Sequence, residues 1–259
     1  MDWFEAFILG TLQGLTEFLP VSSSGHLELG KYLFGVDSEV GLAFTVSVHG
    51  ATVLSTIIVF RKELSDLVRG LFRFRWNSET RYIVLLLWSM VPVGIAGLFF
   101  KDSIESLFEG KLVLVGLMLI VTALILFLTR FFSDRGRDIG FGSALIIGLA
   151  QAVAVIPGIS RSGATISTGM MLGISRDRVA GFSFLMVLLP VIGANMLEFA
   201  DGQGVHGSGN ITEIVIGFVA AFVAGLVACR FMLALVKKSG MWWFSIYCLI
   251  VGLISIMLG

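Results

Sequence analysis

The chain has 259 residues, of which 56% are hydrophobic and only 14% are charged, and its mean hydropathy is +0.96. A typical soluble domain carries about 25% charged residues, so this composition excludes a disordered chain and an ordinary soluble enzyme. Eighteen Lys and Arg residues balance eighteen Asp and Glu residues, which leaves no net charge to attract a nucleic acid. The composition predicts an integral membrane protein that has no nucleic-acid partner.

Six stretches are long and apolar enough to cross a membrane as helices, which requires about 20 predominantly apolar residues. These predicted spans are 43–60, 82–100, 111–130, 179–198, 211–235 and 241–258. Two other apolar regions, 3–35 and 141–175, are interrupted near their middle by Pro, Ser and Gly. Each arm of these two regions is too short to span comfortably, so each region is predicted to form a re-entrant helical hairpin.

The two predicted hairpins resemble each other in sequence at a separation of 138 residues. The matching residues are Gly10, Gln13, Ser22, Ser24 and Gly25 in the first and Gly148, Gln151, Ser160, Ser162 and Gly163 in the second. Three predicted spans follow each hairpin, and an odd number of crossings inverts the second half relative to the first. The predicted fold class is therefore an all-α polytopic membrane protein with an inverted-topology repeat, in which each half is a re-entrant helical hairpin plus three transmembrane helices. It forms a single integral domain, 1–259, with repeats at about 1–138 and 139–259.

The distribution of Lys and Arg predicts the orientation in the membrane. If the loop after the first full span is cytoplasmic, thirteen basic residues fall on that side and only Lys101 and Lys111 fall outside. Both termini are then extracytoplasmic, and the first hairpin enters from outside while the second enters from the cytoplasm. Apolar residues at helical spacing over 64–72, beside basic residues, indicate an amphipathic helix on the inner leaflet, with a solvated loop as the alternative.

Ionisable side chains at membrane depth are costly and mark candidate functional sites. Glu17, His26, His49 and Arg161 are such residues, and Glu198 is a less clear one. Glu17 follows Gln13 by one helical turn, so both side chains project from one face. A carboxylate with neighbouring oxygen ligands can hold Mg²⁺ or Ca²⁺, although a buried Glu can also be a neutral, hydrogen-bonded acid.

The two serine-rich turns each begin a predicted helix, and helix N-termini with small residues favour anions. Hydroxyl donors for a phosphate group would come from Ser22, Ser23, Ser160, Ser162 and Thr165. Arg161 adds a permanently charged fork that suits phosphate oxygens. Helix capping alone can also explain the serines, and Arg161 can instead form a structural ion pair with Glu17.

Two runs closely resemble the signature motifs of the bacitracin-resistance (BacA/UppP) family, the undecaprenyl-pyrophosphate phosphatases. They are QGLTEFLPVSSSGH at 13–26 and PGISRSGAT at 157–165, and the resemblance covers nearly the whole chain. It implies a phosphatase of the bacterial cytoplasmic (inner) membrane that converts a polyprenyl pyrophosphate lipid to the monophosphate, helped by a divalent metal, Mg or Ca. Such an enzyme recycles the lipid carrier of cell-wall synthesis and confers bacitracin resistance.

By position, the resemblance implies that Glu17 is the second acid of an acidic motif, Ser23 the nucleophile and His26 the catalytic histidine. It also implies that Arg161 binds phosphate, with Ser160 and Thr165 as further polar positions. Many members carry Glu where this chain has Gln13, and the resemblance implies that Gln13 is a second metal ligand beside Glu17.

Charge alternation and the resemblance both indicate an active site that opens to the extracytoplasmic side. A hypothesis from another class is a translocase of the polyprenyl phosphate carrier, which the inverted repeat motivates. Assembly into a homo-oligomer is left open.

Overall fold

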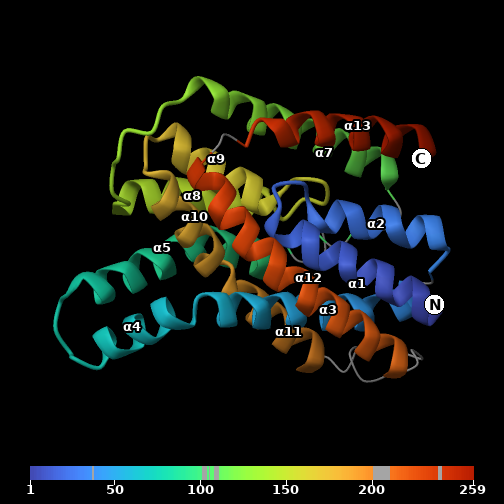
Figure 1. The fold of residues 1–259 in the computed structure, drawn as a ribbon, viewed down its shortest axis with the longest axis horizontal. Coiled ribbons are helices and arrows are strands. Elements are labelled where there is room, and N and C mark those ends of the chain that lie inside the picture. Colours follow the sequence, from blue (N-terminus) through green and yellow to red (C-terminus); the bar gives the residue numbers. More distant parts are fainter. Residues whose placement is uncertain (37, 101–103, 105, 108–110, 201–210, 239–240) are drawn as a thin grey trace.

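The computed structural model describes the chain except for residues 37, 101–103, 105, 108–110, 201–210 and 239–240 (Figure 1). The described residues are helical, with an isolated backbone bridge between Arg137 and Ile174 and no β-strand. The all-α prediction is therefore confirmed. The helices are α1 (Trp3–Phe18), α2 (Ser23–Phe34), α3 (Ser38–Val59), α4 (Arg61–Leu71), α5 (Ser78–Phe99), α7 (Leu112–Leu128), η1 (Thr129–Phe131), α8 (Phe141–Val153), α9 (Arg161–Met171), α10 (Arg176–Met186), α11 (Leu188–Ala200), α12 (Ile211–Lys238) and α13 (Trp243–Leu258).

In the described part of the chain, three helices are each long and apolar enough to cross a membrane. They are α5, α7 with its continuation into η1, and α12, which agree with the predicted spans 82–100, 111–130 and 211–235. The chain bends by 74° between α3 and α4. Nearly all of the predicted amphipathic segment, 64–72, lies in α4, so this segment forms a helix and not a loop. α13 has 16 residues, a rise of about 24 Å, and is shorter than the predicted span 241–258.

The prediction of one continuous helix over 179–198 is wrong. α10 ends at Met186 and α11 begins at Leu188, with a single non-helical residue, Val187, between them. Pro190 supplies the physical reason, because proline has no N–H and its ring clashes with the carbonyl of the residue four positions earlier, Met186. The chain is therefore interrupted within an apolar stretch.

Both predicted hairpins form as pairs of short helices joined by buried turns. Residues 19–22 join α1 to α2, and residues 154–160 join α8 to α9. Serine caps the second helix of each hairpin, because Ser22 Oγ accepts from the Gly25 N–H and Ser160 Oγ accepts from the Gly163 N–H. The two tips touch, since a Cβ on Gly25 would lie 3.2 Å from the Cα of Gly158.

The helices α7 and α13 lie side by side above the hairpin tips (Figure 1). Their backbones meet at Gly116 and Gly252, where a Cβ on either glycine would lie 2.6 or 2.8 Å from the carbonyl oxygen of the other. The Ser255 hydroxyl donates to the Leu112 carbonyl at 2.9 Å, so residue numbers rise along α7 as they fall along α13. The two helices are therefore antiparallel and in backbone contact.

The first helix of each hairpin packs on a long helix from the other half of the chain. A Cβ on Gly10 in α1 would lie 2.3 Å from the Gly217 carbonyl oxygen in α12. A Cβ on Gly148 in α8 would lie 2.1 Å from the Ser89 carbonyl oxygen in α5. Small residues therefore allow close backbone approach at both contacts.

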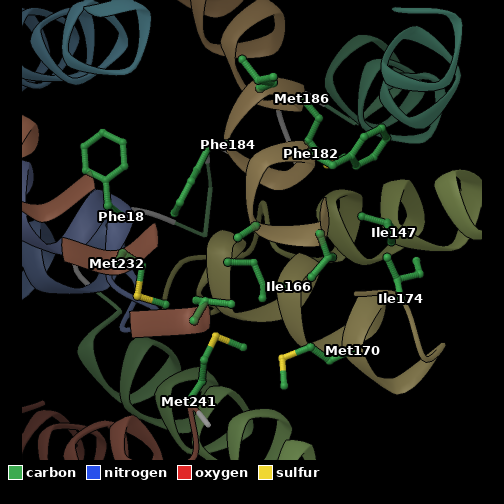
Figure 2. Packing of buried hydrophobic residues seen from close by; sticks show 14 of the residues in the cluster. Phe18, Ile147, Ile166, Met170, Ile174, Phe182, Phe184, Met186, Met232 and Met241 are labelled. Carbon is green, nitrogen blue, oxygen red and sulfur yellow. The ribbon is translucent and has the colours of Figure 1, made fainter. Parts of the chain in front are cut away.

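Buried Phe, Ile and Met side chains from α1, α8, α9, α10 and α12 pack into one cluster (Figure 2). The Phe18 and Phe184 rings lie edge to face with their centroids 5.7 Å apart, and the Phe60 and Phe184 ring centroids are 6.3 Å apart. Phe18 follows Glu17 directly in the sequence, so this packing fixes the end of α1 beside the candidate site.

We expect Gly116→Ala to lower the melting temperature of the purified protein in detergent, because the new methyl group would meet a backbone carbonyl of α13. Overpacking of this kind costs about 1–3 kcal/mol. The matched control is Gly94→Ala in α5, where no atom of the described residues lies within 4 Å of the added Cβ. Equal melting temperatures for the two variants would contradict the α7–α13 contact.

Candidate active site

Glu17, at the end of α1, accepts hydrogen bonds from three side chains. Arg161 Nη2 lies 2.6 Å from Glu17 Oε1. The Ser23 hydroxyl and the Gln13 amide donate to Glu17 Oε2 at 2.8 and 3.0 Å. The Glu17 and Arg161 side chains are only 11% and 14% exposed, so the ion pair is largely removed from solvent. The two hairpins thus meet through opposite charges.

Arg161 is placed by the cap of α9 and anchored by α10. It is the first residue after the N-cap, and its second nitrogen, Nη1, donates to the Ser183 carbonyl at 3.3 Å. Thr165, one turn further along α9, is hydrogen-bonded to the Ser183 hydroxyl at 2.6 Å. Ser183 lies in an apolar run, and sequence reasoning gave it no part in the site.

The remaining serines are engaged in the turns. Ser22 and Ser160 cap helices, and Ser22 adopts a positive φ of 70°, which is rare for a residue other than glycine. The Ser162 hydroxyl donates to the Leu19 carbonyl at 3.1 Å and so ties the two tips together. Ser23 is therefore the serine whose hydroxyl is bonded directly to the Glu17 carboxylate.

His26 is bonded to a different helix. Its Nδ1 lies 2.8 Å from the Ser22 carbonyl, which can only accept, so Nδ1 carries a proton. Its Nε2 lies 2.8 Å from the hydroxyl of Tyr247 in α13, and the two rings stack with centroids 5.6 Å apart. In the described part of the chain no hydrogen bond joins His26 to Glu17, Ser23 or Arg161. Tyr247 was missed because a lone Tyr in an apolar helix carries no distinguishing sequence signal.

A polar face of α3 lies against Glu17 and Arg161. A small cavity there is lined by Glu17, Thr52, Val53, Thr56, Arg161, Val187, Leu188 and Val191, so the α10–α11 break borders the site. His49 precedes Thr52 by three residues and therefore lies on the same face of α3. Its Nδ1 lies 2.8 Å from the Thr45 carbonyl. His49 therefore belongs to the surroundings of the site, whereas the side chain of Glu198 lies outside the described residues.

A larger cavity of about 420 Å³ lies one helical turn further along α3. It is lined by Phe60, Glu63, Asp66, Leu67, Tyr82, Asp177, Gly181, Leu185, Leu233 and Lys237. Phe60 follows Thr56 by one turn, and Leu185 precedes Val187 by two residues, so the two cavities are neighbours. Phe60, which lines the larger cavity, packs its ring against that of Phe184, with the two ring centroids 6.3 Å apart.

Comparison with known proteins identifies the family. Residues 6–254 match the family described as "Bacitracin resistance protein BacA". The chain belongs to this family. A protein of Bacteroides fragilis is 50% identical over 260 residues, which cover 99% of this chain and 98% of the relative. A Parabacteroides distasonis protein is 50% identical with the same coverage, and a Methanosphaera stadtmanae protein is 36% identical over 100% and 98% of the two chains. All three relatives are named undecaprenyl-diphosphatase. With its long apolar helices, this member of the BacA family is a multi-pass membrane protein.

We expect Arg161→Lys to lower turnover of a polyprenyl pyrophosphate by about 100-fold, because a lysine keeps the charge but cannot bind with two parallel N–H groups. The matched control is Arg230→Lys on an exposed face of α12, which should stay within about twofold of the parent. Steady-state kinetics on purified, folded variants make the comparison. Equal activity of Arg161→Lys and the parent would rule out a role for the guanidinium fork.

Proposed function

We propose that this member of the BacA family hydrolyses undecaprenyl pyrophosphate to undecaprenyl phosphate and inorganic phosphate. The observation that carries the proposal is the cluster in which Glu17 joins Arg161 of one hairpin to Ser23 of the other. A cation for the phosphate oxygens, a hydroxyl and a carboxylate lie within hydrogen-bonding distance of one another. The names of the relatives agree with this chemistry.

Binding of the pyrophosphate group would exchange the partner of Arg161. A phosphate oxygen competes with Glu17 for the guanidinium, which then faces the anion. Released from its cation, Glu17 keeps its hydrogen bond to Ser23 and becomes a stronger proton acceptor. The resting ion pair would therefore open as the substrate enters.

In the chemical step, the oxygen of Ser23 or of a water attacks the terminal phosphorus while Glu17 takes the proton of that oxygen. The bond from phosphorus to the bridging oxygen breaks, and lipid monophosphate leaves. If Ser23 attacks, water then hydrolyses the phosphoserine. Arg161 and the N–H groups at the start of α9 stabilise the charge that develops on the phosphoryl oxygens. For His26 to carry a proton at Nε2, Tyr247 must first release that nitrogen, since Nδ1 is held by Ser22.

The residues present fit a divalent cation. Gln13 Oε1 is buried and has no hydrogen-bond partner among the described residues, and it lies beside the Glu17 oxygen that Gln13 Nε2 contacts. A turn of the amide would present that oxygen next to Glu17, and an all-oxygen donor set suits Mg²⁺ or Ca²⁺. With one carboxylate in the set, the phosphate oxygens would supply further ligands. A bound cation would neutralise charge on the pyrophosphate.

We expect purified protein to release phosphate from undecaprenyl pyrophosphate, and excess chelator to abolish the release. Gln13→Glu should retain activity and lower the concentration of divalent cation needed for half-maximal rate, since a second carboxylate binds the cation more tightly. The measurement is phosphate release during titration with Mg²⁺ or Ca²⁺. Absence of release with either cation contradicts the proposed hydrolysis. Release with an unchanged metal requirement in Gln13→Glu contradicts only the pairing of residues 13 and 17.

We further propose that the two halves form an inverted repeat. Support comes from helix positions, because α1, α2 and α3 begin at Trp3, Ser23 and Ser38 and their counterparts α8, α9 and α10 each begin 138 residues later. The antiparallel pairing of α7 with α13 also fits, since these helices end the two halves. The repeat and the charge distribution together favour a site that opens to the extracytoplasmic side.

A translocase of the carrier remains the second candidate function. The two neighbouring cavities favour it, because Thr56 and Val187 line the smaller one while Phe60 and Leu185, close to them in the sequence, line the larger one. An opening between the two cavities would connect the site to the face that carries Asp177 and Lys237.

Thiol labelling tests the sidedness of the site. Thr45→Cys, one helical turn before His49 on α3, should react with a membrane-impermeant reagent added outside, and a pyrophosphate analogue should protect it. Lys111→Cys should mark the outside and Ser133→Cys the cytoplasm. The native Cys229 and Cys248 are buried and stay in place. Labelling of Thr45→Cys only from the cytoplasm contradicts the orientation, and labelling from both sides favours the translocase.

A further inference from the structure

Thr122 in α7 lies outside both sequence motifs, yet it contacts the turn that precedes Arg161. Its side chain is 1% exposed. The Thr122 hydroxyl donates to the Gly158 carbonyl at 2.9 Å and accepts from the Ser160 N–H at 3.0 Å. One hydroxyl therefore satisfies two backbone groups two residues apart, which needs a donor and an acceptor on the same atom.

The turn at residues 158–160 also packs directly against the backbone of α7. Gly158 has a φ of +95°, and a Cβ there would lie 2.4 Å from the Val115 carbonyl oxygen. Ser160, the next residue bound by Thr122, is the N-cap of α9. Arg161 follows the cap directly, so the position of this turn sets where its side chain leaves the backbone.

We propose that Thr122 is a positioning residue for the anion site, an inference that rests on the proposed phosphatase function. It holds the turn so that the Arg161 guanidinium and the first N–H groups of α9 converge on the terminal phosphate. Thr122 makes no contact with substrate and acts through the backbone of residues 158–160. Its loss would leave the Gly158 carbonyl and the Ser160 N–H buried without partners, and the turn would shift to satisfy them.

The test uses Thr122→Val, which keeps the shape and removes the hydroxyl, and Thr122→Ser, which keeps the hydroxyl. The matched control is Thr129→Val, since Thr129 is similarly buried but, among the described residues, its hydroxyl bonds to the nearby Leu126 carbonyl and not to the turn. Inhibition by inorganic pyrophosphate reports anion binding, and melting temperature reports stability. If Thr122→Val does not fold, Thr122→Cys, with its weak thiol hydrogen bonds, replaces it.

We expect Thr122→Val to weaken inhibition by pyrophosphate and to lower kcat/KM about 10-fold or more, because small misplacements of a charged group are costly in catalysis. Thr122→Ser should restore both quantities, and Thr129→Val should leave both near the parent values. Equal inhibition constants for Thr122→Val and Thr129→Val would overturn the inference, whatever their melting temperatures. An inactive parent protein would instead contradict the proposed function, so the two failures are distinguishable.

Discussion

The structure depends on hydrogen bonds to two buried turns, residues 19–22 and 154–160. Their backbone N–H and C=O groups cannot all be paired within a regular helix. An apolar environment offers no hydrogen bonds, so each unpaired group there is costly. The first turn receives Ser162 from the opposite hairpin and, at 3.7 Å, the Cys248 thiol of α13. The second receives Thr122 of α7. Partners for each turn come from the other half of the chain, so the turns take their final form only when the halves are packed.

The ion pair between Glu17 and Arg161 is a second interaction that joins the two hairpins. Breaking a buried ion pair costs about 3–5 kcal/mol because one charge is left alone. The Glu17–Arg161 pair therefore holds the two hairpins together, and in the proposed mechanism an anion would take the place of the carboxylate. Gln13, which is uncharged, does not disturb the charge balance of the Glu17–Arg161 pair. A neutral amide can donate to Glu17, whereas a carboxylate at that position would need an added cation to offset the repulsion.

The sequence was sufficient to predict features that depend on length and local pattern. Two interrupted apolar regions predicted the hairpins, and the spacing of Gln13 and Glu17 predicted a shared helical face. Hydropathy alone does not reveal the break at Val187, because the residues on both sides of it, including those around Pro190, are apolar. Thr122 and Tyr247 were beyond reach for a different reason, since a neutral polar residue in an apolar helix becomes informative only through the residues it contacts.

The two hairpins share a scaffold but carry complementary side chains. Counting 138 residues onward from Glu17, Ser23 and His26 leads to Val155, Arg161 and Ala164. Two copies of the first hairpin would bring two acids to the meeting point of the tips, and two copies of the second would bring two guanidinium groups. Either arrangement would bury like charges at a cost of several kcal/mol. Because the tips meet face to face, a repeated scaffold can support this site only where one copy supplies the carboxylate and hydroxyl and the other supplies the cation.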